Sequence, residues 1–492
     1  MIMNFFLGSL LMLSLCSADV PQFKEPVYTM YEEKGILKVK VETSSGTPEQ
    51  LYKSMLKEAK KSSLLGMAYV NQLAKENYPS AQRIAVIYEG YRAFFINRNK
   101  ENLLNICIKI LNDQQADELA VSIAAYVQQV LNHEPIVESA GSKFIKNLIP
   151  SIKQTLTLTP PEKLYQEQEV RIPEMSGSHN AFPDLIKYNG SYYASFREGD
   201  SHGSHTDFGK IRILRGNYNE TIHEWKWENE ALLSSHTYDF RDPKFFVDSD
   251  DRLRLIFDGS IIGFEDTTDQ MIPHVASQVD GEWKVEKALI DPQMKCDKGQ
   301  WIWRITWNPQ DNCGYGFSYS IDSPEKAAVL TLVKTTDGIR FEKVVDISVD
   351  KPKEGLSEST IRFKEDGTAV ALIRSQRHGL IGTASSESDY KEWSFEVVPF
   401  RVGGPNFLIS DGNLKMWAAT RHFFVNPDNT LDETTIVAAM DKKRLVPLLC
   451  LKSYGDGSYP GMVLEEDGSM TILYYTSSED EKSNIYVTRV KP

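Results

Sequence analysis

A repeat in the second part of the chain limits the folds that this sequence can adopt. From about Val170 onward, an apolar run, a polar turn and a second apolar run recur about every forty to sixty residues. The units open at FPDLIKYNG, RDPKFFVDSDD, WRITWNPQDN, SESTIRFKEDG, GGPNFLISDG and SYPGMVLEEDG. Most continue with two further runs, often near a tryptophan, which makes four strands a unit. Radial repetition of four-stranded units is typical of a β-propeller.

We therefore predict a mostly β fold, with a six-bladed β-propeller over residues 159–492 and a small α-helical domain before it. The last unit ends after its third strand, so EQEVRI at residues 167–172 is predicted to supply the closing strand. Five blades is the alternative reading if one unit is misassigned.

The residues before the repeat have a different periodicity. Residues 26–43 alternate apolar and polar around a Glu-Lys-Gly turn, which predicts a short β-hairpin within residues 19–46. After an N-cap at Thr47 and a proline at the first helical position, apolar residues recur three and four apart. This spacing predicts an α-helical domain over residues 47–158, which ends before the linker that contains Pro160-Pro161.

The ends of the sequence and its composition restrict location and partners. Residues 1–18 form an apolar run of signal-peptide length, so we expect cleavage near Ala18 and a secreted or periplasmic protein. No later stretch has the length and apolarity of a transmembrane segment. A net charge of −13 disfavours nucleic acid as a partner. The cysteines are scattered without metal-type spacing, and we predict no metal and no cofactor.

The strand openings carry most of the candidate chemistry. In a propeller the innermost strand of each blade lines the axis, so residues at these openings and at the ends of the second strands converge. The ionisable residues there are Asp184, Arg197, Arg241, Asp242, Asp258, Arg304, Glu358, Arg374, Arg421, Tyr459 and Tyr475. Several arginines with carboxylates and a tyrosine indicate a site that binds an anion and transfers protons. The alternative is that some of them form ion pairs between blades.

Several of these stretches carry a family resemblance. ASFREGD followed by TDFGKIRILRG, the Glu and Arg of SESTIRFKEDGTAVALIRS, and SYPGMVLEEDGSMTILYY are similar to the first, the Glu-bearing and the last blades of the sialidase superfamily. KTTDGIRF at residues 334–341 resembles a degenerate Asp-box turn of that superfamily. The resemblance covers roughly residues 165 to 492, about two thirds of the chain.

The resemblance implies an exported glycoside hydrolase that cleaves a terminal, acidic sugar from a glycan or glycoconjugate. Tyr459 would be the nucleophile, Glu358 its base, and Asp207 the general acid/base. Arg374 and Arg421 would bind the substrate carboxylate through planar, bidentate pairing. A phenol suits this role because a carboxylate nucleophile would be repelled by an acidic substrate.

The sequence departs from the family at the first blade. Sialidases open that blade with Arg-Ile-Pro, where the strand alignment puts Ala181-Phe182-Pro183, and Arg171-Ile172-Pro173 lies about ten residues earlier. Arg197 is therefore the predicted third substrate-binding arginine. Further substrate-binding candidates are Arg241, Arg304, Asp184 and Asp242. The general acid is open among four residues of one loop, Asp200, His202, His205 and Asp207, and Tyr475 is the alternative nucleophile.

Two other functions stay open. HNAFPDLIKYNGSYYASF and FRDPKFF also resemble five-bladed, furanosidase-type glycosidases. On that reading Asp184 is the base or nucleophile, Asp242 orients or stabilises, and Glu358 is the acid. The third possibility is a non-catalytic glycan-binding or scaffolding propeller whose helical domain docks a protein partner. For His179, a hydrogen bond within its loop is the expected role and a place in the site is the alternative.

Overall fold

The computed structural model describes most of the chain as two compact units. The described residues are 29–33, 36–40, 48–59, 63–97, 99–149, 152–157, 164–172, 176–263, 268–294, 296–320, 329–347, 355–375, 378–398, 400–410, 415–453, 455–477 and 482–491. The signal peptide predicted over residues 1–18 lies outside them. The first unit combines residues 1–162 with 423–432 and 448–450, and the second contains the remaining residues.

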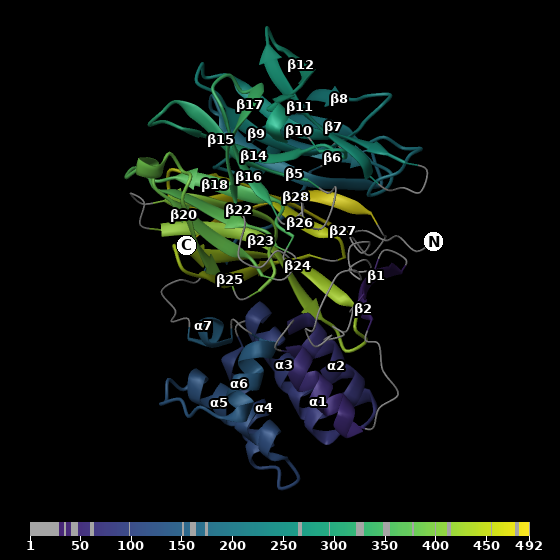
Figure 1. Ribbon diagram of the computed structural model, residues 1–492. Helices are drawn as coiled ribbons and strands as arrows, with labels where there is room; N and C mark the ends of the chain where they lie inside the picture. The colour runs from purple at the N-terminus through teal and green to yellow at the C-terminus, as the bar shows by residue number, and fades with distance from the viewer. Residues whose placement is uncertain are drawn as a thin grey trace, which may run out of the picture. The chain divides into compact units, whose positions relative to one another are not determined.

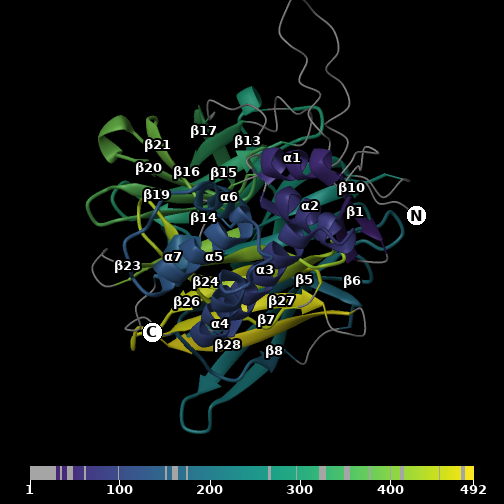
Figure 2. The same ribbon diagram turned by 90° about the horizontal axis from the view of Figure 1, so that it is seen from below.

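Between residues 29 and 157, the described part of the first unit is helical apart from one short hairpin. Its elements are β1 (Thr29–Glu33), β2 (Ile36–Lys40), α1 (Pro48–Ala59), α2 (Ser63–Lys75), α3 (Pro79–Asn97), α4 (Lys100–Leu111), α5 (Glu118–Leu131), α6 (Ala140–Leu148) and α7 (Ile152–Leu156). Side-chain caps start several helices: Asp117 accepts from the Ala120 N–H at 2.9 Å, and Ser139 and Ser142 form a capping box. Helices α3, α4 and α5 lie side by side in this unit (Figure 2). Among the described residues, no helix combines the length and apolarity needed to cross a membrane.

A distant segment completes the core of the helical unit. Residues 423–432 form the tip of a strand hairpin that the sequence analysis placed within the propeller range. The Phe424 ring packs edge-on against Phe95, with centroids 5.3 Å apart. The Val425 N–H donates to the Tyr88 hydroxyl at 3.2 Å, and Asn71 donates to the Asn426 carbonyl at 2.7 Å. Helical periodicity carries no information about such a distant insertion.

The second unit is mostly β, with small sheets in a propeller-like arrangement (Figure 1). Its strands are β3 (Tyr165–Gln166), β4 (Val170–Arg171), β5 (His179–Tyr188), β6 (Ser191–Gly199), β7 (Lys210–Asn219), β8 (Glu224–Leu233), β9 (Asp239–Val247), β10 (Leu253–Ile262), β11 (Thr268–Val279), β12 (Glu282–Lys287), β13 (Leu289–Ile290), β14 (Trp301–Asn308), β15 (Cys313–Tyr319), β16 (Leu330–Thr335), β17 (Arg340–Ile347), β18 (Ser359–Phe363), β19 (Ala369–Ile373), β20 (Leu380–Ala384), β21 (Trp393–Val397), β22 (Gly403–Ser410), β23 (Lys415–Val425), β24 (Leu431–Met440), β25 (Leu445–Leu451), β26 (Gly457–Leu464), β27 (Met470–Ser477) and β28 (Ser483–Lys491).

Hydrogen bonding divides these strands into fewer sheets than the repeat predicts. Four sheets have four or five strands each, and one sheet has nine strands because β28 pairs with β5 in parallel at Ser483 and His179. The predicted count of six therefore differs from the count of bonded sheets among the described residues. The first strands nevertheless follow one another in a closed ring, in the order β5, β9, β14, β18, β22, β26 and back to β5. The predicted closing strand corresponds to β3 and β4, which both pair with β28.

The first strands share one irregularity near their openings. In β5, β9, β14, β22 and β26, two residues are skipped in the register with the second strand, as in a β-bulge. The skipped pairs are Phe182-Pro183, Asp242-Pro243, Trp303-Arg304, Gly404-Pro405 and Tyr459-Pro460. Proline fits here because it has no N–H to contribute to the strand ladder. The Tyr-Pro that opens β26 is thus one case of a repeated structural device.

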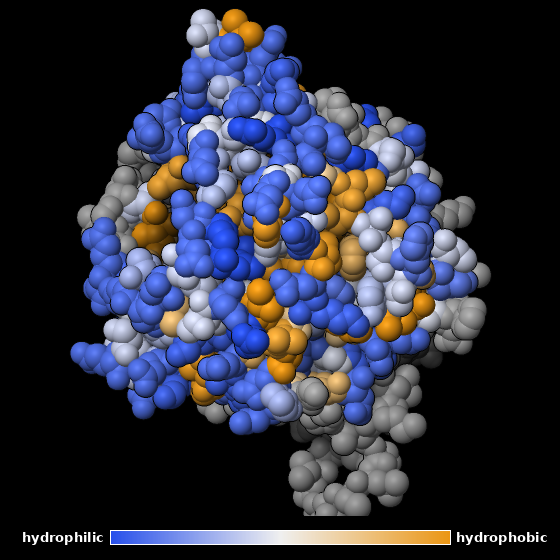
Figure 3. Space-filling model, turned by 90° about the horizontal axis from the view of Figure 1, so that it is seen from above, coloured by the Kyte–Doolittle hydropathy of each residue, from blue (hydrophilic) through white to orange (hydrophobic). Residues whose placement is uncertain are grey.

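Apolar side chains fill the space between the sheets. Strand β6 is buried along its whole length, and aromatic residues from several sheets join one continuous core cluster. One face of the molecule, seen from above, is hydrophilic over most of its surface, with hydrophobic residues gathered toward its middle (Figure 3). Because the inner strands are buried, polar groups are concentrated at their bulged openings.

Candidate active site

Tyr459 is at the centre of a buried polar group. Its hydroxyl donates to Oε1 of Glu358 at 2.7 Å, and Nη1 of Arg374 donates to the same hydroxyl at 3.1 Å. Arg374 Nη1 also lies 2.5 Å from Glu358 Oε1, so the three groups form a closed triangle. The Gly404 N–H donates to the other Glu358 oxygen at 2.8 Å. Tyr459 and Glu358 are only 8% and 7% exposed, so these interactions act in a low-dielectric environment.

The triangle and the Gly404 N–H beside it come from the openings of three first strands and the end of one second strand. Tyr459 lies in the bulge of β26 with φ +53°, and Gly404 lies in the bulge of β22 with the same φ. Glu358 directly precedes β18, and Arg374 directly follows β19. The backbone joins these two residues, because the Arg374 N–H donates to the Glu358 carbonyl at 3.0 Å.

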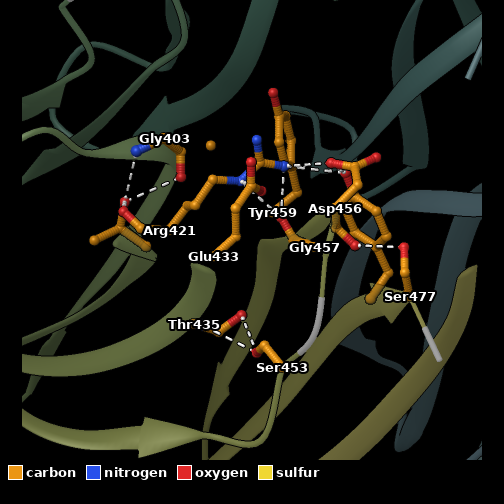
Figure 4. Close-up of polar contacts among 12 residues, drawn as sticks. Gly403, Arg421, Glu433, Thr435, Ser453, Asp456, Gly457, Tyr459 and Ser477 are labelled. Carbon is orange, nitrogen blue, oxygen red and sulfur yellow. Dashed lines mark hydrogen bonds and ion pairs between the residues drawn. The ribbon is translucent and has the colours of Figure 1, made fainter. Parts of the chain in front are cut away.

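Arg421 also contacts Tyr459, through the face of its ring. Its guanidinium carbon lies 5.1 Å from the centre of the Tyr459 ring, in a cation–π geometry. Its Nε forms an ion pair with Glu433 at 3.0 Å, and its Nη2 donates to Asp456 at 3.0 Å (Figure 4). Nη2 also donates to the Tyr475 hydroxyl at 3.1 Å. Arg374 and Arg421, both predicted from the sequence, are therefore brought together on the same tyrosine.

The bulged residues of the other first strands surround the tyrosine ring. The Phe182 and Trp303 rings lie with their centroids 5.2 and 5.5 Å from that of Tyr459. At position 404 a Cβ would lie 2.7 Å from Cγ of Tyr459, so only glycine leaves room for the ring. The repeated bulge thus directs side chains from separate sheets to one point. This packing fixes the position of the phenol.

The pKa shifts of Tyr459 and Glu358 indicate which of the two groups holds the proton of their hydrogen bond. Burial raises the pKa of Tyr459 and the Glu358 charge raises it further, while Arg374 and Arg421 oppose the increase. Burial also works against ionisation of Glu358, yet Arg374 and the hydrogen bonds from Tyr459 and Gly404 hold the Glu358 pKa below its usual range. Tyr459 is therefore the neutral donor and Glu358 the ionised acceptor.

Arg197 does not belong to this group, contrary to its predicted place as the third substrate-binding arginine. It is 0% exposed, and its guanidinium forms a bidentate pair with Asp239 at 2.9 and 2.7 Å. Its remaining nitrogen donates to the Ser201 carbonyl at 2.6 Å. All of its guanidinium nitrogens are occupied, so Arg197 holds the loop after β6 in place.

Arg241, unlike Arg197, lies over an aromatic ring of the Tyr459 group. Its guanidinium lies over the Phe182 ring at 5.3 Å, and that ring contacts Tyr459. Its Nε, like that of Arg374, is buried and lacks a hydrogen-bond partner among the described residues. Buried donors of this kind are expected to be satisfied in the functional state of a protein. The nearest recorded carboxylate oxygen to the Nε of Arg241 is Oδ2 of Asp242, at 3.9 Å, which is beyond hydrogen-bond distance.

Asp184 and Arg304 form a structural pair. Arg304 Nη1 lies 2.8 Å from one Asp184 oxygen, and the Phe245 N–H donates to the other oxygen at 2.7 Å. Both side chains are buried. Asp242 differs because one of its oxygens is buried and has no hydrogen-bond partner among the described residues. Burial raises the pKa of Asp242 to about 6, against the attraction of Arg241 and Lys244.

The residues of the loop that follows β6 differ in whether they contact the residues around Tyr459. The Asp207 carboxylate accepts the Asp200 N–H at 2.5 Å within this loop. His202 instead reaches Asp456, with Nδ1 and Oδ2 3.2 Å apart, and its ring lies 5.2 Å from that of Phe182. His179 reaches the same Asp456 oxygen at 3.2 Å. The structure thus brings His202 and His179, but not Asp207, into contact with residues around Tyr459.

Asp456 and Glu433 were not predicted from the sequence. The sequence does contain a pattern that could have identified Asp456. Asp456 precedes the bulged Tyr459 by three residues, as His179 precedes the bulged Phe182. Equivalent positions in neighbouring repeats of a propeller converge. Glu433 lies at no strand opening, so its ion pair with Arg421 depends on packing alone.

Comparisons with known proteins give a fold and no family. No family model matches the sequence, and no curated protein matches it. Among solved structures, a protein of unknown function from Dyadobacter fermentans DSM 18053 aligns with a TM-score of 0.55 and 14% identity. The alignment covers 67% of this chain and 99% of that chain. At this identity the likeness shows a shared fold alone.

Weaker likenesses involve sialidases. Trypanosoma rangeli sialidase aligns with a TM-score of 0.47 and 10% identity, over 66% of this chain and 60% of that chain. NanB sialidase from Streptococcus pneumoniae aligns with a TM-score of 0.46 and 11% identity, over 68% and 72% of the two chains.

Proposed function

We propose that this protein is an exported, sialidase-like glycoside hydrolase that removes a terminal acidic sugar with Tyr459 as nucleophile. The observation that carries the proposal is the 2.7 Å hydrogen bond from the Tyr459 phenol to the ionised Glu358, beside Arg374 and Arg421. An exported location rests on the predicted signal peptide. On this proposal the ring of first strands is a six-bladed propeller, with the nine-stranded sheet counted as two blades.

The arrangement suits attack by a phenol. As the Tyr459 oxygen forms a bond to the anomeric carbon, its proton passes to Glu358 Oε1, which is already its hydrogen-bond acceptor. The bond from the anomeric carbon to the leaving oxygen breaks, and that oxygen takes a proton from Asp207, a step that requires the loop after β6 to bring Asp207 from its contact with Asp200 to the sugar. Water then attacks the glycosyl–tyrosine intermediate, gives its proton to Asp207, and the Tyr459 oxygen recovers its proton from Glu358.

The arginines account for an acidic substrate. Arg374 and Arg421 both contact Tyr459, and Arg241 reaches the same group through Phe182. A substrate carboxylate beside them would be bound by charge-assisted hydrogen bonds, and it would satisfy the buried Nε atoms of Arg241 and Arg374. A second carboxylate as nucleophile would meet repulsion there, whereas a neutral phenol does not.

Hydrolysis of a sialoside with a chromogenic leaving group tests the proposal. We expect turnover by the wild-type protein and a loss of about 100-fold or more in kcat/KM for Tyr459→Phe. Tyr474→Phe is the matched control, because it also removes a buried phenol that hydrogen-bonds a glutamate, Glu169, outside this group. Wild-type protein without turnover, or Tyr459→Phe with full activity, would exclude the proposal.

A two-carboxylate glycosidase is the second candidate, and Asp242 is the observation that favours it. Its buried position and its pKa near 6 suit a general acid, and the Glu358 charge influences it. The form of this hypothesis that assigns chemistry to Asp184 is weaker, because Arg304 and the Phe245 N–H already occupy that carboxylate. Turnover of neutral furanosides that Asp242→Asn abolishes and Tyr459→Phe preserves would establish the second candidate. Glycan binding without turnover would leave a non-catalytic propeller.

A further inference from the structure

Two histidines and one aspartate from separate strand openings meet at one atom. His179 opens β5, His202 lies in the loop after β6, and Asp456 directly precedes β26. Nε2 of His179 and Nδ1 of His202 each lie 3.2 Å from Oδ2 of Asp456. The three ligand atoms all lie within 4.8 Å of one another. The predicted mechanism uses none of these groups.

We propose that His179, His202 and Asp456 bind one divalent first-row transition-metal ion, with zinc as the reference ion. At metal–ligand distances of about 2.0–2.2 Å, neighbouring ligand atoms around a tetrahedral ion lie about 3.3 Å apart. Two of the three edges of this cluster already have that length. Two imidazoles and one carboxylate match the donor preference of zinc and of ferrous iron, whereas calcium and magnesium prefer oxygen donors alone.

Surrounding contacts hold the ligands in position. The second oxygen of Asp456 accepts from the Tyr475 hydroxyl at 2.8 Å and from Arg421 at 3.0 Å, which leaves Oδ2 directed at the histidines. The two imidazole rings lie 5.2 Å apart in an edge-on arrangement. Bonds of this kind to a ligating carboxylate orient it and adjust metal affinity.

The charges around the cluster permit a cation. Arg421 is a positive group in contact with Asp456 through its Nη2, and Glu433 pairs with its Nε at 3.0 Å. Two carboxylates therefore face one guanidinium. Arg241 donates to the backbone carbonyl of His202 at 3.0 Å.

Three protein ligands leave a fourth position for water or a substrate oxygen, which is the arrangement of catalytic and substrate-binding metal sites rather than closed structural ones. Asp456 shares Arg421 with the Tyr459 site, and His202 shares Phe182 with it. An ion at this position would lie beside the proposed sugar site. It would bind an oxygen of the same ligand.

Metal titration of the full chain tests the inference without any activity measurement. Chelator-treated protein is titrated with Zn²⁺ by calorimetry and with Co²⁺ by visible absorption. We expect one ion per chain, and at least a 10-fold weaker affinity in His202→Ala and Asp456→Asn, since even outer-shell changes cost about that much. His205→Ala, three residues along the same loop, is the matched control and should bind as the wild type does.

X-ray absorption of the wild-type Co²⁺ complex gives a readout that does not depend on folding of the variants. Scattering from two imidazoles is expected, and bound Zn²⁺ should raise the midpoint of thermal unfolding of the wild type but not of His179→Gln. Wild-type protein that binds neither ion, a complex without imidazole scattering, or an affinity unchanged in Asp456→Asn would each overturn the inference. These outcomes are independent of whether a sialoside is hydrolysed.

Discussion

The Tyr459 hydroxyl and the Glu358 carboxylate are joined by a 2.7 Å hydrogen bond, although 100 residues separate them in the sequence. Arg374 contacts both, so neither group can move or titrate without the other two. The pair is therefore one functional unit in which the phenol holds the proton and the carboxylate accepts the bond. Its two members should depend on each other in function as they do in geometry.

A double-mutant cycle on this pair tests that dependence. We expect Tyr459→Phe and Glu358→Gln each to lower kcat/KM for a sialoside by about 100-fold or more, because each removes one half of the proton transfer. The double variant should lose little more than the worse single variant, since groups that act together are strongly non-additive. Losses that multiply in the double variant would show that the two residues act separately.

Gly404 leaves room for the Tyr459 ring because it has no side chain. Its φ of +53° costs a substituted residue about 1–2 kcal/mol, and a Cβ would also lie 2.7 Å from the Tyr459 ring. We expect Gly404→Ala to lower the free energy of unfolding in urea and to lower sialoside turnover. The added clash should contribute about 1–3 kcal/mol beyond the backbone cost.

Gly190→Ala separates the two costs of a substitution at Gly404. Gly190 has φ +79°, and a Cβ there would meet nothing within 4 Å. It should show the backbone cost alone, with turnover unchanged. Equal losses of stability in the two variants would mean that the Tyr459 ring yields to the methyl group, and that Gly404 does not position it.

Arg197 is expected to contribute to the free energy of unfolding and not to the catalytic step. Its buried bidentate pair with Asp239 satisfies both charges, so Arg197→Met should leave Asp239 uncompensated and lower the free energy of unfolding by about 3–5 kcal/mol. Combining Arg197→Met with Asp239→Leu should recover most of that loss, because apolar pairs often replace buried ion pairs without penalty. Urea denaturation of the wild type and of the two variants measures both effects. A double variant as unstable as the single one would refute this account of the pair.

Periodicity and turn-forming residues were sufficient to predict where the first strands open. The recurring Phe-Pro, Asp-Pro, Gly-Pro and Tyr-Pro pairs are a local property of the chain, because in four of the five bulges a residue with positive φ is followed by one without an N–H. The meeting of Tyr459, Glu358 and Arg374 follows from repetition around a ring. For these residues the sequence alone sufficed to propose a common site.

The partners of individual arginines were beyond the reach of the sequence. Arg197 and Arg241 both lie near strand ends, yet only the packing between sheets decides that Asp239 neutralises the first and that the second faces Phe182. The number of sheets likewise depends on one parallel contact between Ser483 and His179. Such outcomes depend on differences of an ångström between side chains far apart in the sequence, which periodicity does not encode.

Asp258 should make the stability of the protein depend on pH. It is fully buried, and burial raises its pKa from the ordinary value of 3.8 to about 8, although Ser260 and Arg241 oppose the shift. Between these two values the folded chain holds a proton that the unfolded chain has released. The contribution of Asp258 to the free energy of unfolding is therefore complete below about pH 4 and is lost as the pH rises toward 8.

Asp258→Asn tests this dependence because a carboxamide stays neutral at every pH and still accepts a hydrogen bond from Ser260. Relative to the wild type, the variant should gain a few kcal/mol of unfolding free energy between pH 5 and pH 8, measured by urea denaturation across that range. Asp248→Asn is the control of opposite sign. Burial of Asp248 is outweighed by its bond from Arg254, which lowers its pKa, so that variant should be destabilised by the same amount at pH 5 and pH 8. If the difference in unfolding free energy between the wild type and Asp258→Asn does not change over this pH range, then Asp258 is ionised in the folded protein.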